Sequence, residues 1–243
     1  MSEFSPEEPP SSTPPVFNVP AVVLVLVFLL LAIHGALQLL GQEWQTYALY
    51  LFSFIPARLG GGEVIPMAPG SQVWSFLTYA FLHGDWIHVG SNCIWLLIFS
   101  TPVARRLGVL RYLALLAVSA VAGAAIMLPL NWGQFMFLVG ASASVSGAMA
   151  AAMPIMFSPE FHRGANVSGI RVLTVGELLR SRQAIGFAAV FIALQLFTGS
   201  AQTLSATAFL EERNIAWEAH IGGFLAGFIF FYFVDGISRI RTT

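Results

Sequence analysis

The sequence has little charge, and the charges it has nearly cancel. Only 9% of its 243 residues are charged and 57% are hydrophobic, whereas a soluble domain carries roughly 25% charged residues. With a mean hydropathy of +0.77, a water-soluble fold is excluded. The 11 basic and 12 acidic residues leave a net charge of −1. No basic field therefore attracts phosphates, and nucleic acid is not expected as a partner.

Lysine is absent, and cysteine occurs once, as Cys93. A single cysteine excludes an internal disulfide and a cysteine-rich metal site. We expect Cys93 to pack as a small apolar side chain, and we expect neither a metal nor a cofactor.

Long runs of apolar residues are the main feature of the sequence. A helix that crosses about 30 Å of hydrocarbon needs roughly 20 residues, and six runs approach that length. The sequence therefore predicts an all-α membrane protein with a domain of six transmembrane helices over residues 20–236. The predicted spans are Pro20–Leu40, Trp86–Pro102, Val109–Leu130, Ala141–Phe157, Gln183–Thr198 and Ile215–Val234.

The segments outside the runs have distinct compositions. Residues 1–19 are rich in Pro, Ser and Glu and lack the positive start of a signal peptide, which predicts a disordered tail. The first span is then a retained anchor, with an unusual cleaved leader as the alternative. Residues 41–73 mix aromatic residues with Gly and Pro, which favours an interfacial loop at the lipid headgroups. Residues 237–243 form a second short tail.

The arginines indicate the orientation, because short cytoplasmic loops carry an excess of positive charge. Arg58 and Arg213 lie in loops on one side of the predicted bundle, and the other arginines lie on the opposite side. Both termini are therefore predicted to be cytoplasmic, with loops 41–85, 131–140 and 199–214 outside. The cytoplasmic arginines are Arg105, Arg106, Arg111, Arg163, Arg171, Arg180, Arg182, Arg239 and Arg241.

Polar side chains within the spans are few, and an ionisable residue at membrane depth is a functional hypothesis by default. No acidic residue or arginine lies deep in a span; Glu218 and Asp235 lie near the ends of the last one. A small-solute transporter, which usually needs such a charge, is a disfavoured alternative. The polar residues to explain are His34, His83, His88, Asn92, Ser142, Ser144, Ser146 and His220.

Small residues surround Ser142 and follow His220. Taken alone, the run Gly140–Gly147 and the pair Gly223 and Gly227 favour close helix packing. If these two spans are neighbours, however, Ser142 and His220 meet near their outer ends. A neutral histidine activates a serine hydroxyl as a nucleophile, so nucleophilic catalysis is the alternative to packing.

Donors for an oxyanion are present on the second span. His88 and Asn92 are four residues apart and share a helix face, and the Ser142 backbone N–H is free in the first turn of its helix. Glu218 is two residues from His220 and points to nearly the opposite face. The arrangement is therefore a Ser–His dyad, without a carboxylate as third member.

Three motifs, in order, resemble those of the rhomboid intramembrane serine proteases, over roughly residues 74–235. The segment from His83 to Asn92 is similar to the family's HxxxN pattern with its preceding histidine. Gly140-Ala141-Ser142-Ala143 is similar to GxSG, and the segment from Ala219 to Gly227 is similar to AHxxGxxxG. Together, on the expected spans, these motifs are highly specific.

The resemblance implies a role for each site residue. Ser142 is the nucleophile and His220 the general base, and the oxyanion is held by His88, Asn92 and the Ser142 N–H. His83 lies at the periphery of the site. Three departures accompany it: Ala143 replaces a motif glycine, Ser75 follows Trp74 where the family often has arginine, and Ser146 stands where some members stack an aromatic ring on the catalytic histidine.

The expected function is cleavage of transmembrane protein substrates near the outer end of their helix. The expected location is the inner membrane, with the site open to the periplasmic side. The alternative is an inactive rhomboid-like protein that binds membrane clients without cleaving them. The sequence does not determine the oligomeric state.

Overall fold

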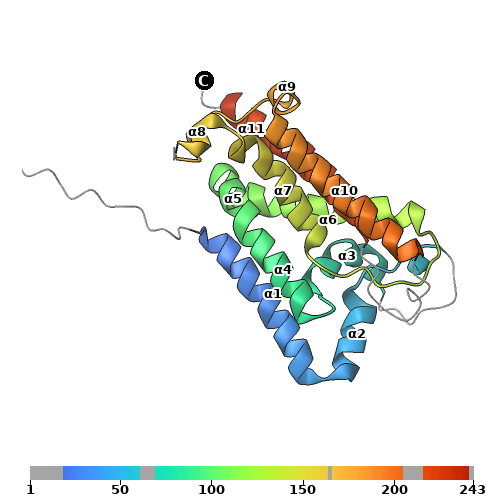
Figure 1. Ribbon diagram of the computed structural model, residues 1–243. Helices are drawn as coiled ribbons and strands as arrows, with labels where there is room; N and C mark the ends of the chain where they lie inside the picture. The colour runs from blue at the N-terminus through green and yellow to red at the C-terminus, as the bar shows by residue number, and fades with distance from the viewer. Residues whose placement is uncertain (1–18, 61–68, 164–165, 205–215, 241–243) are drawn as a thin grey trace, which may run out of the picture.

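The described part of the chain folds almost wholly into helices (Figure 1). The computed structural model describes residues 19–60, 69–163, 166–204 and 216–240. Over these ranges it contains no β-strand, and an isolated antiparallel bridge joins Phe54 and Leu138. The predicted N-terminal tail lies outside the described residues except for residue 19. Residues 237–240 of the predicted C-terminal tail continue the last helix.

Four helices in the described part of the chain are long and apolar enough to cross a membrane. They are α1 (Ala21–Leu40), the continuous helix Trp86–Leu107, α6 (Val109–Leu130) and the Trp217–Gly236 part of α11 (Trp217–Ile240). The protein is therefore a multi-pass membrane protein.

Two shorter apolar helices occupy the other predicted spans. They are α7 (Ser142–Met156) and the Arg182–Phe197 part of α10 (Arg182–Leu204). The helix α10 continues past Thr198, where the sequence predicts an outer loop. The count of six spans and the cytoplasmic side of the termini remain predictions.

The second span has a widened turn in its middle. It consists of α4 (Trp86–Trp95), a π-helical turn (Leu96–Ser100) and α5 (Thr101–Leu107). Pro102 has no N–H to donate to the carbonyl four residues earlier, which disturbs the regular ladder at this point. The Thr101 hydroxyl donates to the Leu97 carbonyl at 2.6 Å. The span thus changes hydrogen-bond pattern and still runs to Leu107.

The centre of the bundle is formed by α11 against α6 and α7. Glycines let these backbones approach closely: a Cβ on Gly223 would meet the Ala143 carbonyl oxygen, and one on Gly227 would meet the backbone of Gly147. Buried alanines, among them Ala148 and Ala151, line the rest of this face of α7. This close packing brings the start of α7 to the start of α11.

The segment after α1 folds back on the bundle. It contains α2 (Gln42–Phe52), the 3₁₀ turn Pro56–Arg58, α3 (Ser71–Thr78) and the 3₁₀ turn Tyr79–Phe81. Its location at the lipid interface remains a prediction.

Side chains complete the C-terminal end of α2, where the last carbonyls of a helix have no partner within it. Trp74 Nε1 donates to the Leu51 carbonyl at 2.9 Å and Thr78 Oγ1 to the Phe52 carbonyl at 2.7 Å. Arg58 donates to the Ser53 carbonyl at 3.0 Å and also to that of Tyr50. Trp74 thus anchors this segment without the arginine that often follows it in the family.

At the other end of the bundle a buried ion pair joins two helices. Arg106 Nε lies 2.7 Å from Asp235 Oδ1, and both side chains are at most 10% exposed. The same guanidinium donates to the carbonyls of Ser168 and Ile170, at 3.0 and 2.9 Å. It therefore ties the end of α5 to α11 and to the loop between the short helices α8 (Pro159–His162) and α9 (Val175–Leu178).

Candidate active site

Ser142 is the first residue of α7, and the segment before it is held in place by backbone hydrogen bonds. Phe54 and Leu138 exchange two such bonds, at 3.2 and 2.9 Å, and the Gly140 N–H donates to the Tyr79 carbonyl at 3.0 Å. Because Ser142 starts the helix, its own N–H has no acceptor within α7. The serine is thus presented at a helix N-terminus by a fixed turn.

Gly140 is needed in this turn for two reasons. Its φ is +115°, a backbone conformation that residues other than glycine rarely adopt. A Cβ at this position would also lie 2.6 Å from His88 Nε2. The first glycine of the serine motif therefore allows the His88 ring to pack against the backbone next to Ser142.

Ser142 and His220 are joined directly. The distance between Ser142 Oγ and His220 Nε2 is 2.8 Å, within the usual range of a hydrogen bond. His220 lies in the first turn of α11, and the glycine contacts described above hold that turn against α7. The structure thus brings together the two residues that the sequence selects as nucleophile and base.

The other ring nitrogen of His220 has a partner that sequence reasoning missed. His220 Nδ1 lies 2.6 Å from Gln195 Oε1, on α10. Gln195 is an amide within an otherwise apolar run, and this polar residue at membrane depth was the signal that could have identified it. Glu218 does not take this place, since Asn131 Nδ2 donates to its carboxylate at 3.5 Å.

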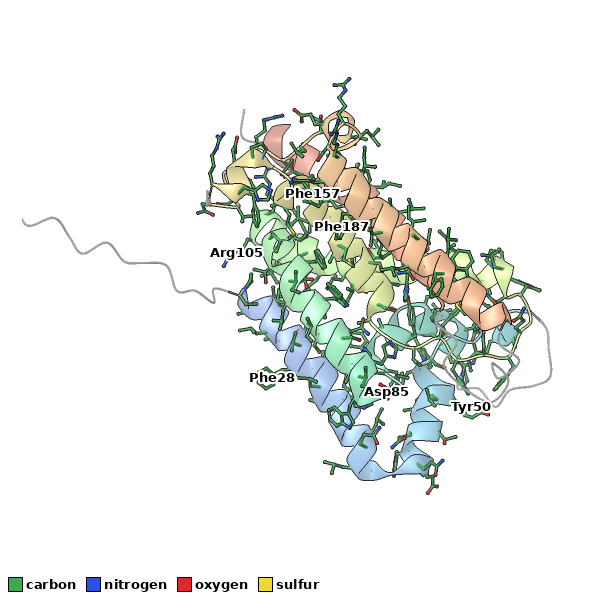
Figure 2. All side chains as sticks on the ribbon, viewed as in Figure 1. Phe28, Tyr50, Asp85, Arg105, Phe157 and Phe187 are labelled. Atoms are coloured by element: carbon green, nitrogen blue, oxygen red, sulfur yellow. The ribbon has the colours of Figure 1, made fainter. Side chains whose placement is uncertain are left out.

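His88 and Asn92 lie on α4, and the His88 ring lies beside Gly140. Asp85 caps this helix by accepting a hydrogen bond from the His88 N–H at 2.7 Å, and Figure 2 shows Asp85 at the end of α4. Asn92 is buried, and its amide donates to the His88 carbonyl at 2.9 Å. One of its two N–H bonds is therefore used within its own helix.

His83 holds the turn before Ser142 through a hydrogen bond to its backbone. Its Nε2 accepts a hydrogen bond from the Ala141 N–H at 3.3 Å, and its ring centroid lies 5.0 Å from that of His88. Burial lowers the pKa of His83 to about 3, and repulsion from His88 and His34 acts in the same direction. A neutral His83 therefore holds the residue that precedes Ser142.

Two residues that depart from the family motifs, Ala143 and Ser146, are accommodated by nearby groups. Ala143 is buried, and a Cβ on Gly123 of α6 would lie 2.7 Å from the Ala143 methyl. The glycine on α6 thus gives room for the alanine. The Ser146 hydroxyl donates to the Ser142 carbonyl at 2.8 Å, so it is engaged with its own helix.

The remaining histidines and the cysteine lie outside this arrangement. His34 is buried and packs edge-on against Trp86, with 4.6 Å between the ring centroids. Cys93 belongs to a buried apolar cluster with Val89. His162 is exposed at the end of α8.

The fold and the site define a class: a helical membrane protein with a hydrogen-bonded serine and histidine at the ends of two closely packed apolar helices. A model of the Rhomboid domain matches residues 70–235. The chain belongs to the rhomboid family, a family of intramembrane proteases, which confirms the resemblance of its motifs.

Curated relatives agree with this assignment. The chain is similar to "Rhomboid protease GlpG" of Yersinia pestis (strain Pestoides F) and of Yersinia pseudotuberculosis (serotype O:3, strain YPIII). Each is 32% identical over 82 residues, which cover 34% of this chain and 27% of the relative. The similarity thus spans about a quarter of the length of these relatives.

Proposed function

We propose that the protein is a serine endopeptidase that cleaves membrane-spanning proteins by a Ser142–His220 dyad. The observation that carries this proposal is the 2.8 Å contact between Ser142 Oγ and His220 Nε2 at the start of α7. A serine hydroxyl is a weak nucleophile until a base removes its proton. A histidine nitrogen at this distance can accept that proton.

The reaction has two halves. The Ser142 proton moves to His220 Nε2 as Oγ bonds to the carbonyl carbon of the substrate peptide. The C–N bond then breaks, and the leaving amine takes the proton from His220, which leaves an acyl ester on Ser142. Water gives a proton to His220 and attacks the ester. The C–O bond breaks, Ser142 regains its proton, and the acid product leaves.

The oxyanion of each tetrahedral intermediate needs donors fixed in advance. The Ser142 N–H, which has no acceptor within α7, is the first of them. His88 packs against Gly140 beside it, and Asn92 has a second amide N–H beyond the one given to the His88 carbonyl. We assign the oxyanion site to these three groups, with His83 as the residue that fixes the turn.

Membrane-spanning proteins are the substrates that suit such a site. A peptide bond in a helix is shielded, so substrates are single-span proteins whose helix unwinds easily near its outer end. The distribution of arginines supports cytoplasmic termini, and with them a site that opens to the opposite side of the membrane. The family resemblance favours the inner membrane, with that opposite side periplasmic.

Labelling of the purified protein by a fluorophosphonate tests the proposal. This probe forms a covalent adduct with an activated serine, and intact mass detects the adduct. We expect one adduct on the native chain and none on Ser142→Ala or His220→Ala. Ser144→Ala is the matched control, because this hydroxyl donates to the Leu116 carbonyl on α6. If the folded native chain gives no adduct, the proposal is wrong, and the inactive membrane client binder becomes the favoured alternative.

A further inference from the structure

The position of the proton on the His220 ring is constrained, because the ring must accept the proton of Ser142. For Ser142 to give up its proton, the Nε2 atom that lies 2.8 Å away must carry a lone pair. In a neutral imidazole the single proton is then on Nδ1. The Nδ1–H needs an acceptor, because a buried donor without one costs free energy. Whatever accepts this bond selects the tautomer in which His220 can act as a base.

The acceptor is the side-chain oxygen of Gln195, at 2.6 Å. A Gln amide presents an oxygen or an NH₂ group, and the two ends select opposite tautomers. With the oxygen toward Nδ1, the proton stays on Nδ1 and Nε2 is free to accept. With the NH₂ group toward it, Nδ1 would have to accept and Nε2 would carry the proton, which is the wrong arrangement for a base.

The register between α10 and α11 keeps Gln195 opposite His220. Phe191 lies one turn before Gln195, and Phe224 lies one turn after His220. The two phenylalanine rings stack at 4.7 Å between centroids, with 20° between their planes. In an antiparallel pair of helices, a contact at 191 and 224 places 195 opposite 220. The aromatic stack therefore fixes the position from which the amide reaches the ring.

The neighbouring polar side chains are engaged elsewhere. The Ser146 hydroxyl bonds the Ser142 carbonyl, and the Glu218 carboxylate accepts from Asn131. We infer that Gln195 is the positioning residue of His220: its oxygen accepts from Nδ1–H and keeps the proton off the nitrogen that faces Ser142. The dyad is thus completed by a neutral third member from a separate helix.

The inference rests on the proposed function and is tested with three variants of the full chain in detergent micelles. Gln195→Leu has a similar size and no acceptor. Gln195→Glu keeps an acceptor oxygen at the same reach. Gln183→Leu, at an exposed position near the start of the same helix, is the matched control.

Rates are measured by fluorophosphonate labelling and by cleavage of a single-span substrate, with kcat and KM separated. We expect Gln195→Leu to lower the labelling rate and kcat by about 10- to 100-fold, by analogy with the loss of a partner that orients a metal-binding histidine. KM should not change, because Gln195 acts through the base. Gln195→Glu should restore the rate to within a few fold of the native value, and Gln183→Leu should match the native protein.

A spectroscopic measurement follows the tautomer directly. Imidazole ¹⁵N shifts distinguish a protonated from an unprotonated ring nitrogen, and comparison with His220→Ala assigns the His220 signals. We expect the Nδ1-protonated form in the native chain and in Gln195→Glu, and a mixture of tautomers in Gln195→Leu. This readout does not require activity.

The outcomes separate the two proposals. Native rates and a native tautomer in Gln195→Leu would overturn the role of Gln195 and leave the dyad intact. Equal losses in Gln195→Leu and Gln195→Glu would also overturn it, since they would show a need for the amide itself. Absence of labelling in the native chain would overturn the proposed function.

Discussion

Gly227 of α11 lies against the backbone of Gly147 of α7, so closely that a Cβ on Gly227 would lie within 2.6 Å of the Gly147 carbonyl carbon. This contact is two turns from His220 on the same helix. It sets the distance between α7 and α11, and with it the distance between the serine and the histidine. Small residues in this spacing are typical of closely packed membrane helices.

Gly227→Ala should therefore weaken both the fold and the site. Forcing a methyl group into a packed interface costs about 1 to 3 kcal/mol of unfolding free energy, and the labelling rate of Ser142 should fall as the helices separate. Unfolding by a denaturing detergent and fluorophosphonate labelling measure the two effects. Gly236→Ala, on the same helix with nothing within 4 Å of the added Cβ, should be neutral or slightly stabilising. Equal behaviour of the two variants would contradict the packing argument.

Asn92→Ala tests the oxyanion assignment. Removal of one preorganised donor lowers kcat by roughly 10²- to 10³-fold in other serine enzymes, and we expect a loss of this size with little change in KM. Steady-state cleavage of a single-span substrate measures it. Gln45→Ala is the control, because this amide donates to the Leu37 carbonyl where α1 meets α2. A kcat that survives Asn92→Ala would remove Asn92 from the oxyanion site.

His83 should make the stability of the fold depend on pH. Its pKa is lowered to about 3 in the folded protein by burial and by repulsion from His88 and His34, against about 6.5 in an unfolded chain. Between these values the unfolded state binds more protons, so the stability is full above about pH 6.5 and falls as the pH drops toward 3. The largest slope from one such group is about 1.4 kcal/mol per pH unit.

The measurement is detergent unfolding at a series of pH values, compared with His83→Gln. Glutamine keeps an acceptor for the Ala141 N–H and does not titrate, so the variant should lose part of the slope. His162→Gln, at an exposed position, should keep the native slope. A native slope in His83→Gln would show that other groups cause the acid sensitivity.

Asp235→Asn should destabilise the fold and leave the site intact. Removal of one partner from a buried ion pair costs about 3 to 5 kcal/mol, because the other charge stays buried without its counter-charge; the carbonyls of Ser168 and Ile170 that still accept from Arg106 place the expected loss at the lower end of this range. The ion pair lies at the end of the helices away from the site. Figure 2 shows Arg105, which is next to Arg106 in the sequence, at the opposite end of the helices from Asp85, which caps α4 three residues before His88. The labelling rate of folded protein should thus stay close to native, while unfolding shifts strongly. Glu177→Gln, which breaks an exposed pair with Arg171, should shift unfolding little.

The long apolar runs made the helices predictable. For α1 and α6 the predicted and observed bounds agree to within a residue, because a membrane span needs a continuous apolar segment and little else. The motif glycines likewise favoured close packing of the spans of Ser142 and His220, although they did not identify these two spans as each other's neighbours. In both cases the residues that determine the structure lie close together in the sequence.

Contacts between distant polar groups were not predictable in the same way. Gln195 has no motif around it, and its role follows from the register of α10 against α11, which depends on the stacked pair of Phe191 and Phe224. The capping of α2 by Arg58 and Trp74 depends on a fold-back of the chain after Phe52. Hydropathy contains no information on either arrangement.

The turn before Ser142 also bears on where the folding unit begins. The Rhomboid domain match starts at residue 70, yet the Phe54 backbone pairs with Leu138, and the Ala57 N–H donates to the Gln134 carbonyl at 3.0 Å. A shortened chain restricted to the matched region would remove these partners from the backbone of 134–138, which leads directly into the turn that presents Ser142. A version of the protein that keeps this turn supported must therefore include residues upstream of the boundary that sequence similarity defines, at least from Phe54 onward.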